Sequence, residues 1–408
     1  MSKDLHEKAL AYHQEGKPGK LDVTSHKKLD NDQDLSLAYS PGVAAPVREI
    51  VKDANNVNKY TIKGNLVAVI TDGSAVLGLG NVGPLAAKPV MEGKAVLFKY
   101  FADINAFNIE LDTQDVDEIV KTIKNIAPTF GGINLEDISA PRCFEIERRL
   151  IDELDIPVFH DDQHGTAIIV AAGLLNALEI QGKSITSAKI VVAGGGSAGI
   201  ATLDLLLDLG FNKENMILVD RRGVVSKEQI SIVNKYKAAF AVDTDKKTLE
   251  DALDGADVFI GVARGNLVTK KMVKSMAKNP IVFALSNPDP EISVEDVFAC
   301  RDDAVMATGR SDFPNQVNNV LGFPYIFRGA LDANSKIINT EMKVAAVHAI
   351  KDIAKLPVPQ SLLEIYQVDE LSFGRDYFIP KPFDPRLIDL IPKAIFDAAV
   401  KSGVARLK

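Results

Sequence analysis

The fold of this chain is decided by the stretch Ile190-Val191-Val192-Ala193-Gly194-Gly195-Gly196-Ser197-Ala198-Gly199. The apolar run at its start predicts a buried strand, and the apolar pattern that follows predicts a helix through Leu209. Glycines with G-x-G-x-x-G spacing between a strand and a helix let the backbone approach a pyrophosphate at the helix N-terminus. We therefore predict a dinucleotide site formed by Gly194, Gly196, Ser197, Ala198 and Gly199.

A second strand is predicted at 216–220 and ends in Asp220, 21 residues after Gly199. An acid at about this place accepts a hydrogen bond from the adenosine ribose of NAD, and its charge repels the 2′-phosphate of NADP. We therefore predict NAD as the cofactor. NADP stays open as the alternative, because Arg221 and Arg222 follow at once and a guanidinium group suits a phosphate.

The rest of the C-terminal half alternates strands and helices. Apolar runs at 258–261, 281–285 and 304–307 predict strands, and 341–354 and 385–402 read as closing helices. This alternation predicts a doubly wound α/β fold of Rossmann type. Asn287 follows one of these strands and Asn319 lies in an amide-rich loop, where amides suit hydroxyl and carboxylate recognition or simple turn chemistry.

Paired acids follow two predicted strands upstream of the glycine loop. Asp161 and Asp162 follow the apolar run 156–159 and precede a long apolar helix from about Gly165 to Ile180. A ligand site and a plain helix N-cap both explain such acids. Glu136 and Asp137 end a second short strand, and carboxylates gathered at neighbouring strand ends repel one another unless a cation lies among them. Oxygen ligands predict Mg²⁺ or Mn²⁺ there. His160 and His164 flank the second pair and are expected to pack or bond locally, with binding of a softer metal as the alternative.

The N-terminal part offers two further candidates. Lys94 precedes 95–101, which we read as a strand, so partial burial would lower its pKa toward that of a general base. An ordinary solvated lysine is the alternative. Tyr39 lies at the edge of the turn Ser40-Pro41-Gly42, where a packing tyrosine is the alternative. Leu66 to Ile70 reads as a buried strand, and residues 20–38 look irregular.

Composition limits the class of protein. The 408 residues predict two domains, which we place at 1–163 and 164–408. A formal net charge of −8 without a basic block argues against nucleic acid and membranes as partners. The two cysteines have no metal-ligand or redox spacing, and residues 1–5 lack the apolar core of a signal peptide. We therefore expect a cytoplasmic protein.

Together, these motifs resemble the malic enzyme family in its small bacterial form. The resemblance spans nearly the whole chain, and the segments that carry it are Ala38–Val43, Thr71–Gly73, Gly78–Gly80, Glu92–Lys94, Leu135–Asp137, Phe159–Ala167, the glycine loop, Leu285–Pro288 and Asn318–Asn319. The family implies oxidative decarboxylation of L-malate to pyruvate and CO₂ with NAD or NADP and a divalent metal. It also implies a homodimer or higher homo-oligomer.

The resemblance gives roles to individual residues. Glu136, Asp137 and Asp162 look like the metal ligands. Lys94 looks like the general base, with Asp161 assisting, and Tyr39 looks like the acid that protonates C3 of the enol. Lys94, Asn287 and Asn319 look like substrate contacts, and Asn287 also faces the cofactor.

One departure concerns the substrate carboxylate. Larger members carry an arginine after the Thr-Asp-Gly motif, whereas this chain has Ser74, and Arg48 and Lys99 are the replacements we consider. A non-decarboxylating hydroxy-acid or amino-acid dehydrogenase and a non-catalytic dinucleotide sensor are the competing functions. Neither of them explains four clustered acids.

Overall fold

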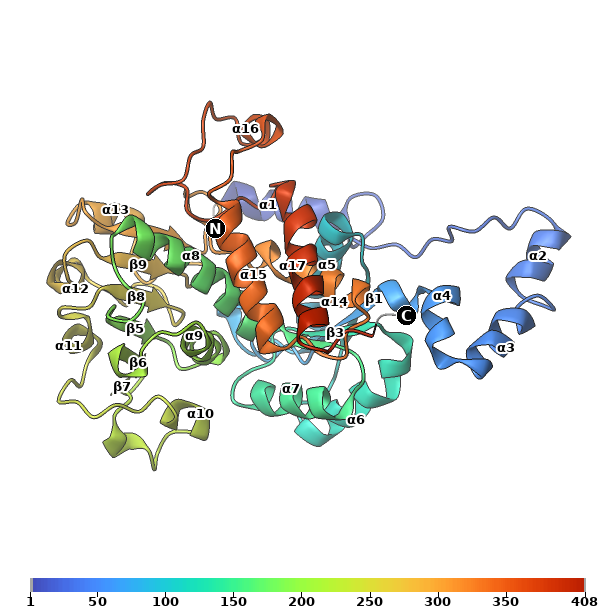
Figure 1. Cartoon of the computed structure of the whole chain (residues 1–408), viewed down its shortest axis with the longest axis horizontal. Coiled ribbons are helices and arrows are strands. Elements are labelled where there is room, and N and C mark those ends of the chain that lie inside the picture. The colour runs from blue at the N-terminus through green and yellow to red at the C-terminus, as the bar shows by residue number, and fades with distance from the viewer. Residues whose placement is uncertain (1–2, 407–408) are drawn as a thin grey trace.

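The computed structural model describes residues 3–406 and contains two sheets (Figure 1). The first sheet is fully parallel, in the order β2-β1-β3-β4. Its strands are β1 (Leu66–Thr71), β2 (Asn105–Glu110), β3 (Gly132–Leu135) and β4 (Val158–His160). The predicted strand at 66–70 is confirmed.

The second sheet has the order β10-β9-β8-β5-β6-β7, and only the short edge strand β7 runs antiparallel. Its strands are β5 (Ile190–Ala193), β6 (Met216–Asp220), β7 (Gly223–Val224), β8 (Val258–Gly261), β9 (Ile281–Ala284) and β10 (Val305–Thr308). The strand order reverses beside β5, which is the arrangement of a doubly wound nucleotide-binding sheet. The predicted fold class is confirmed.

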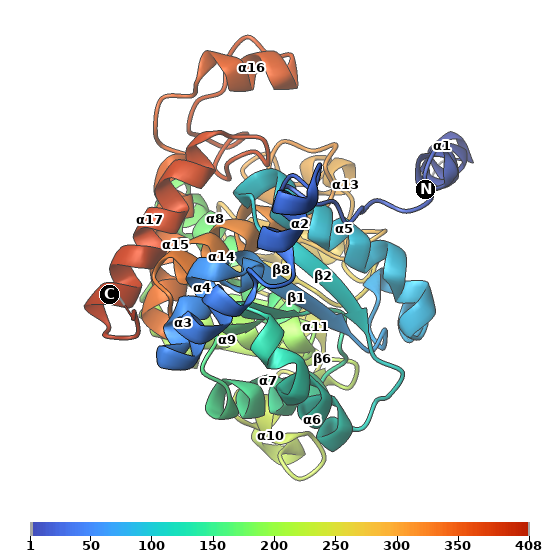
Figure 2. The ribbon, with the colours of Figure 1, turned by 90° about the vertical axis from the view of Figure 1, so that its right-hand side faces the viewer.

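Helices connect and cover the strands (Figure 2). Those in the N-terminal part are α1 (Lys3–Gln14), α2 (Asp32–Ala38), α3 (Ala44–Lys52), α4 (Val57–Tyr60), α5 (Pro84–Ala102), α6 (Val116–Ile126) and α7 (Arg142–Glu153). Those in the C-terminal part are α8 (Thr166–Ile180), α9 (Ser197–Asp208), α10 (Lys235–Ala238), α11 (Leu249–Leu253), α12 (Lys270–Ser275), α13 (Val294–Phe298), α14 (Phe323–Asp332), α15 (Thr340–Ile353), α16 (Gln360–Tyr366) and α17 (Arg386–Lys401). A single π turn, Asp161–Gly165, joins β4 to α8.

One hydrophobic core links the two sheets. Its buried residues run from Leu66 in β1 through the almost wholly buried α8 to Ala399 in α17. Phe98 of α5 packs edge-on against Phe323 and Phe327 of α14, so a C-terminal helix completes the N-terminal layer. Because this core is continuous, the domain boundary at residue 163 stays a prediction.

The predicted strand at 95–101 is wrong, because these residues form the second half of α5. The buried residues of this helix are Ala87, Met91, Lys94, Ala95, Phe98 and Ala102. Steps of three and four residues place them on one face of a helix, whereas a half-buried strand would alternate. A short apolar run fits either period, which explains the error.

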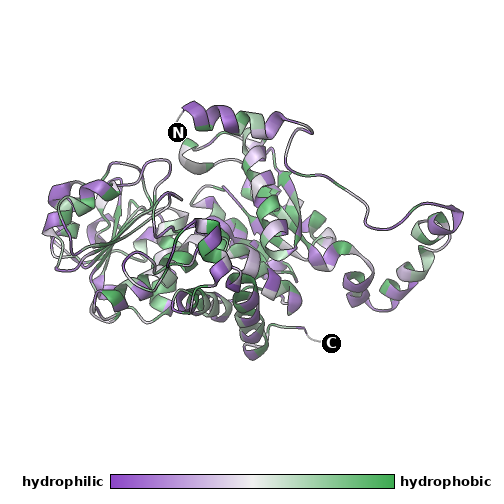
Figure 3. Cartoon of the chain, turned by 90° about the horizontal axis from the view of Figure 1, so that it is seen from above, coloured by the Kyte–Doolittle hydropathy of each residue, from purple (hydrophilic) through white to green (hydrophobic). Residues whose placement is uncertain are grey.

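Residues 21–52 form an arm that leaves the body of the chain, with α2 and α3 far from the second sheet (Figure 1). The arm includes α2, although residues 20–38 look irregular in sequence. All residues of both helices are described, and none of them is buried. Apolar and polar residues are mixed along the arm (Figure 3), and Leu37 is 69% and Val51 81% exposed. Among the described residues, no helix is long and apolar enough to span a membrane.

Candidate active site

The two acidic pairs meet at one edge of the first sheet. Strands β3 and β4 are parallel neighbours, and Leu135 stands opposite His160 in their register. Each pair follows directly after its strand, so the four acids leave the same carboxyl edge. The predicted convergence of the two pairs is therefore confirmed by the sheet topology.

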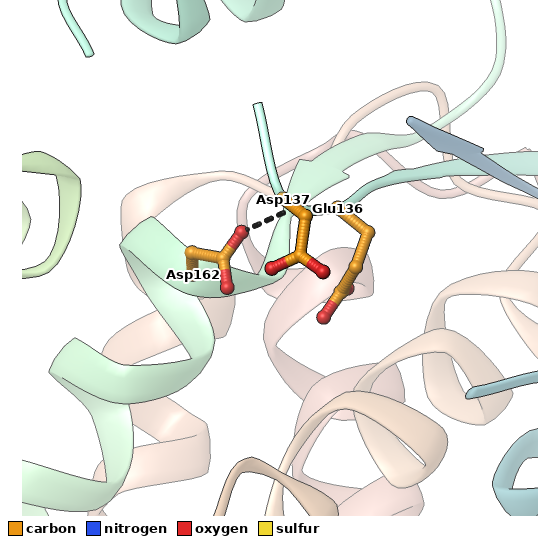
Figure 4. A group of neighbouring side chains, drawn as sticks. All are labelled: Glu136, Asp137 and Asp162. Carbon is orange, nitrogen blue, oxygen red and sulfur yellow. Dashed lines mark hydrogen bonds between the residues drawn. The ribbon is translucent and has the colours of Figure 1, made fainter. Parts of the chain in front are cut away.

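Glu136, Asp137 and Asp162 form a cluster that suits a hard cation. One carboxylate oxygen from each lies within 4.8 Å of the others (Figure 4). The backbone N–H of Asp137 donates to Asp162 Oδ2 at 2.7 Å, and Asp137 adopts a left-handed φ of 54° that turns its side chain toward the group. Burial, followed by the neighbouring acids, raises the pKa of Glu136 although Lys94 opposes this. Two buried carboxylates and the half-buried Asp162, which repel one another, fit Mg²⁺ or Mn²⁺ as oxygen donors.

Lys94 lies beside this cluster. Its Nζ is 2.6 Å from Asp161 Oδ2 and 2.8 Å from Glu136 Oε1, and it lies over the Phe323 ring. Burial alone would lower the pKa of Lys94, but the two carboxylates outweigh burial and raise it. The expected lowering of this pKa is thus wrong for the arrangement observed, since the sequence argument considered burial without the acids that accompany it.

Asp161 is fixed from its other side. Asn319 Nδ2 donates to Asp161 Oδ2 at 3.1 Å, and Thr166 Oγ1 donates to Asn319 Oδ1 at 3.1 Å. A Cβ at Gly165 would lie 1.8 Å from Asp161 Oδ1, so the π turn needs glycine there. Asn319 is therefore brought to the site as expected, where it also orients the acid beside Lys94.

The two histidines near the acids make local contacts, as expected. His164 Nε2 lies 3.0 Å from Glu147 Oε2, and the backbone N–H of His160 donates to Glu147 Oε1. Neither histidine belongs to the carboxylate cluster. Glu147 of α7 thus contacts both ends of the turn that carries Asp161 and Asp162, a contact that the sequence did not predict.

The glycine loop faces the same cleft as the acids. Gly194 has a φ of 127°, and a Cβ at Gly199 would lie 1.8 Å from Gly194 O, so both positions require glycine. The cleft has a volume of about 960 Å³. It is lined by Lys94, Glu136, Ser197, Ala198, Asn287 and Asn319, among others. A nicotinamide cofactor on the loop could therefore reach a substrate beside Lys94.

Asp220 already has a partner at the expected adenosine end of the loop. Lys237 Nζ donates to its Oδ2 and Arg222 N to its Oδ1, both at 2.7 Å. Burial would raise the pKa of Asp220, but these two contacts outweigh burial and lower it. The side chain of Lys237 also crosses Gly195, where a Cβ would lie 2.7 Å from Lys237 Cε. No spacing in the sequence pointed to Lys237, whereas Arg221 and Arg222 are exposed as turn residues.

Three expected residues do not reach the cleft in this chain. Tyr39, at the end of α2 in the arm, is 72% exposed. Arg48 lies on α3 of the arm, and Lys99 pairs with Asp103 on the surface. Their proposed roles thus have no support within one copy of the chain.

The Thr-Asp-Gly loop does not present Ser74 to a substrate. Ser74 Oγ donates to Asp72 Oδ1 and accepts from Ser139 N, and Ala75 is the loop residue that lines the cleft. Arg142 pairs with Asp72 at 3.0 Å and so holds the loop from behind. Ser74 is therefore a structural residue rather than a substitute for the arginine of larger members.

Comparison with known proteins identifies the family. Residues 18–151 match the malic enzyme N-terminal domain, and residues 163–373 match the malic enzyme NAD-binding domain. The chain belongs to the malic enzyme family. It is 58% identical to the NADP-dependent malic enzyme of Halomonas elongata, over 98% of this chain and 94% of that protein. The NAD-dependent malic enzyme of Rhizobium meliloti is 52% identical over 99% of this chain but only 52% of its own length.

The architecture agrees with solved malic enzymes. The crystal structure of malic enzyme from Pyrococcus horikoshii has a TM-score of 0.90 and 43% identity, covering 99% of this chain and 92% of that one. The chain spans about half the length of several other curated malic enzymes that it matches, including that of Escherichia coli. The family assignment of the sequence is confirmed.

Proposed function

We propose that this chain oxidatively decarboxylates L-malate to pyruvate and CO₂ and reduces a nicotinamide cofactor. The observation that carries the proposal is the shared cleft, in which the carboxylate cluster and Lys94 face the glycine loop. A non-decarboxylating dehydrogenase or a sensor has no need for a buried cation site beside a lysine. The relatives named above are malic enzymes, which supports the same reaction.

Glu136, Asp137 and Asp162 would hold Mg²⁺ or Mn²⁺, which supplies Lewis-acid stabilisation of the enolate oxygen. A cation held by Glu136 would weaken the attraction between that carboxylate and Lys94 and would so lower the pKa of the lysine. Lys94 then accepts the C2 hydroxyl proton, and Asp161, 2.6 Å from its Nζ, stabilises the ammonium that forms. Asn319 keeps Asp161 oriented, and Asn287 contacts the substrate or the nicotinamide from the opposite wall.

The carbon acid must come from a second copy of the chain. Tyr39 is exposed on an arm whose helices are not buried, while the cleft remains open beside Lys94. We propose a homodimer in which each arm enters the cleft of the partner and brings Tyr39 to protonate C3. Burial of Leu37 and Val51 in that interface would offset the cost of ordering the arm.

We propose NADP as the preferred cofactor, which reverses the expectation from the sequence. Lys237 neutralises Asp220 and adds a cation where a 2′-phosphate would bind, with Arg221 beside it. The NADP-dependent relatives support this choice, although one relative at 52% identity is named NAD-dependent.

The proposed function is tested by a single assay. Pyruvate formation from L-malate is measured with NADP or NAD, with Mn²⁺ or Mg²⁺, and after chelation of the metal. We expect pyruvate and reduced cofactor in equal amounts, only with the metal present. Accumulation of oxaloacetate without pyruvate, or full activity in chelator, would contradict the proposal.

A further inference from the structure

The cleft lacks the arginine that the larger family members carry for the substrate carboxylate. Ser74 is turned toward Asp72 and Ser139, and Ala75 takes its place at the surface of the cleft. Arg48 and Lys99 lie elsewhere. L-Malate has two carboxylates, and only one of them can chelate a cation together with the C2 oxygen. The second carboxylate is therefore left without a counter-charge from any residue considered so far.

A different cation lines the cleft. Lys20 follows α1 and lies against α5, where its Nζ donates to Pro89 O at 2.7 Å. Its backbone N–H donates to Glu92 Oε2 at 3.0 Å, which fixes the N-terminal segment to this helix. A Cβ at Gly93 would lie 3.3 Å from Lys20 Nζ, so the ammonium sits directly beside the residue that precedes Lys94.

The surroundings of Lys20 leave its charge available. Among the described residues, no acid lies within ion-pair distance of its Nζ, although exposed lysines of the same segment, such as Lys17, are paired. Burial lowers the pKa of Lys20, and the nearby Glu92 carboxylate opposes this effect. A cation in partly desolvated surroundings gains more from an incoming carboxylate than a fully solvated one does.

We propose that Lys20 binds the second carboxylate of the dicarboxylic substrate, the one that leaves as CO₂. This inference rests on the proposed function and adds a specificity residue to it. Lys20 selects a substrate with two carboxylates over a 2-hydroxy acid that has one.

The position has a kinetic consequence. The second carboxylate keeps its negative charge until CO₂ forms, so Lys20 stabilises the bound substrate and the transition state of hydride transfer at C2 to a similar extent. Removal of such a contact raises KM and leaves kcat nearly unchanged. A residue needed for the chemistry itself would instead lower kcat.

The test compares wild type with Lys20→Met, Lys20→Arg and Lys17→Met at saturating metal and cofactor. Lys17 is a matched control, since it lies in the same segment, pairs with Asp22 and does not line the cleft. We expect KM for malate to rise about tenfold or more in Lys20→Met, with kcat within about threefold. Lys20→Arg should recover part of the loss, and Lys17→Met should match wild type.

Oxalate inhibition separates a lost contact from a damaged site. Both carboxylates of oxalate can chelate the same cation, so its inhibition constant should stay within about threefold in Lys20→Met. Lys20→Gln serves as a second neutral variant if the methionine destabilises the chain. An unchanged KM for malate, or equal losses for malate and oxalate, would overturn the assignment of Lys20. Absence of malate turnover in wild type would instead overturn the proposed function.

Discussion

Lys94 Nζ, on α5, lies 2.6 Å from Oδ2 of Asp161, the acid that directly follows β4. Asp161 is fully buried and is held in turn by Asn319. Glu136, the other carboxylate on Lys94, belongs to the cation cluster. If Lys94 is the general base that we propose and Glu136 holds a cation, Asp161 is the carboxylate left to pair with the lysine, and we expect it to control the pH at which the lysine loses its proton.

Asp161→Asn should move the pH dependence of the reaction. The carboxylate raises the pKa of Lys94, so its removal lowers that pKa, and a base with a lower pKa stays deprotonated to lower pH. We expect the acid limb of the kcat/KM profile to shift to lower pH, while kcat falls about tenfold or more because the ammonium loses its partner. The measurement is a pH–rate profile of both proteins. A limb that stays in place would show that another group controls it.

Tyr39→Phe and Lys94→Ala should separate two proton transfers. Reduction of supplied oxaloacetate needs no protonation of carbon, so Tyr39→Phe should lose malate turnover about 100-fold or more and keep most of this reduction. Lys94→Ala should lose both activities, because the lysine serves hydride transfer at C2. The two activities are assayed side by side. Equal losses in Tyr39→Phe would contradict this division of roles.

Mixing Tyr39→Phe with Lys94→Ala tests whether the arm of one subunit completes the site of its partner. A mixed dimer would have one site with an intact lysine and the intact tyrosine of its partner, so subunit exchange should restore roughly a quarter of wild-type activity. If both residues acted within one copy, no site in a mixed dimer would be intact and the mixture would stay inactive. Sedimentation of each variant alone checks that the substitutions leave the oligomer unchanged.

Asp162→Ala should weaken binding of the divalent cation at the carboxylate cluster. The variant removes one of the three clustered carboxylates and the acceptor for Asp137 N–H, so Mn²⁺ affinity and turnover should each fall at least about tenfold. Asp162→Asn keeps an oxygen acceptor and isolates the loss of charge. Mn²⁺ binding by calorimetry gives a readout independent of activity, and Asp152→Ala on the exposed face of α7 is the control. Wild-type affinity in both Asp162 variants would exclude Asp162 as a ligand.

The sequence predicted the parts of the site that depend on where strands end and on the spacing of residues within one short motif. Glu136 and Asp162 could be placed together because parallel neighbouring strands share one carboxyl edge. The glycine loop could be assigned because glycines at this spacing, between a strand and a helix, let the backbone approach a pyrophosphate. Lys20 and Lys237 could not be found, since no motif in the sequence pairs Lys20 with Pro89 of α5 or Lys237 of α10 with Asp220, and only the folded chain brings them together. The prediction of a strand at 95–101 was wrong because a short apolar run is compatible with both the helical and the strand repeat.

Lys237→Gln should reverse the cofactor preference that we propose. Its ammonium lies 2.7 Å from Asp220 Oδ2, where it would screen the acid from a 2′-phosphate and would donate a charge-assisted hydrogen bond to that group. Its loss should lower kcat/KM for NADP by about tenfold or more. The value for NAD should hold or rise, because Asp220 becomes free to accept from the ribose hydroxyl. Lys235→Gln is the matched control, since Lys235 lies on the same short helix α10 but is exposed over Tyr236. Values of kcat/KM for both cofactors are compared at saturating malate. Equal losses for NADP and NAD would show that Lys237 stabilises the glycine loop and does not bind the 2′-phosphate.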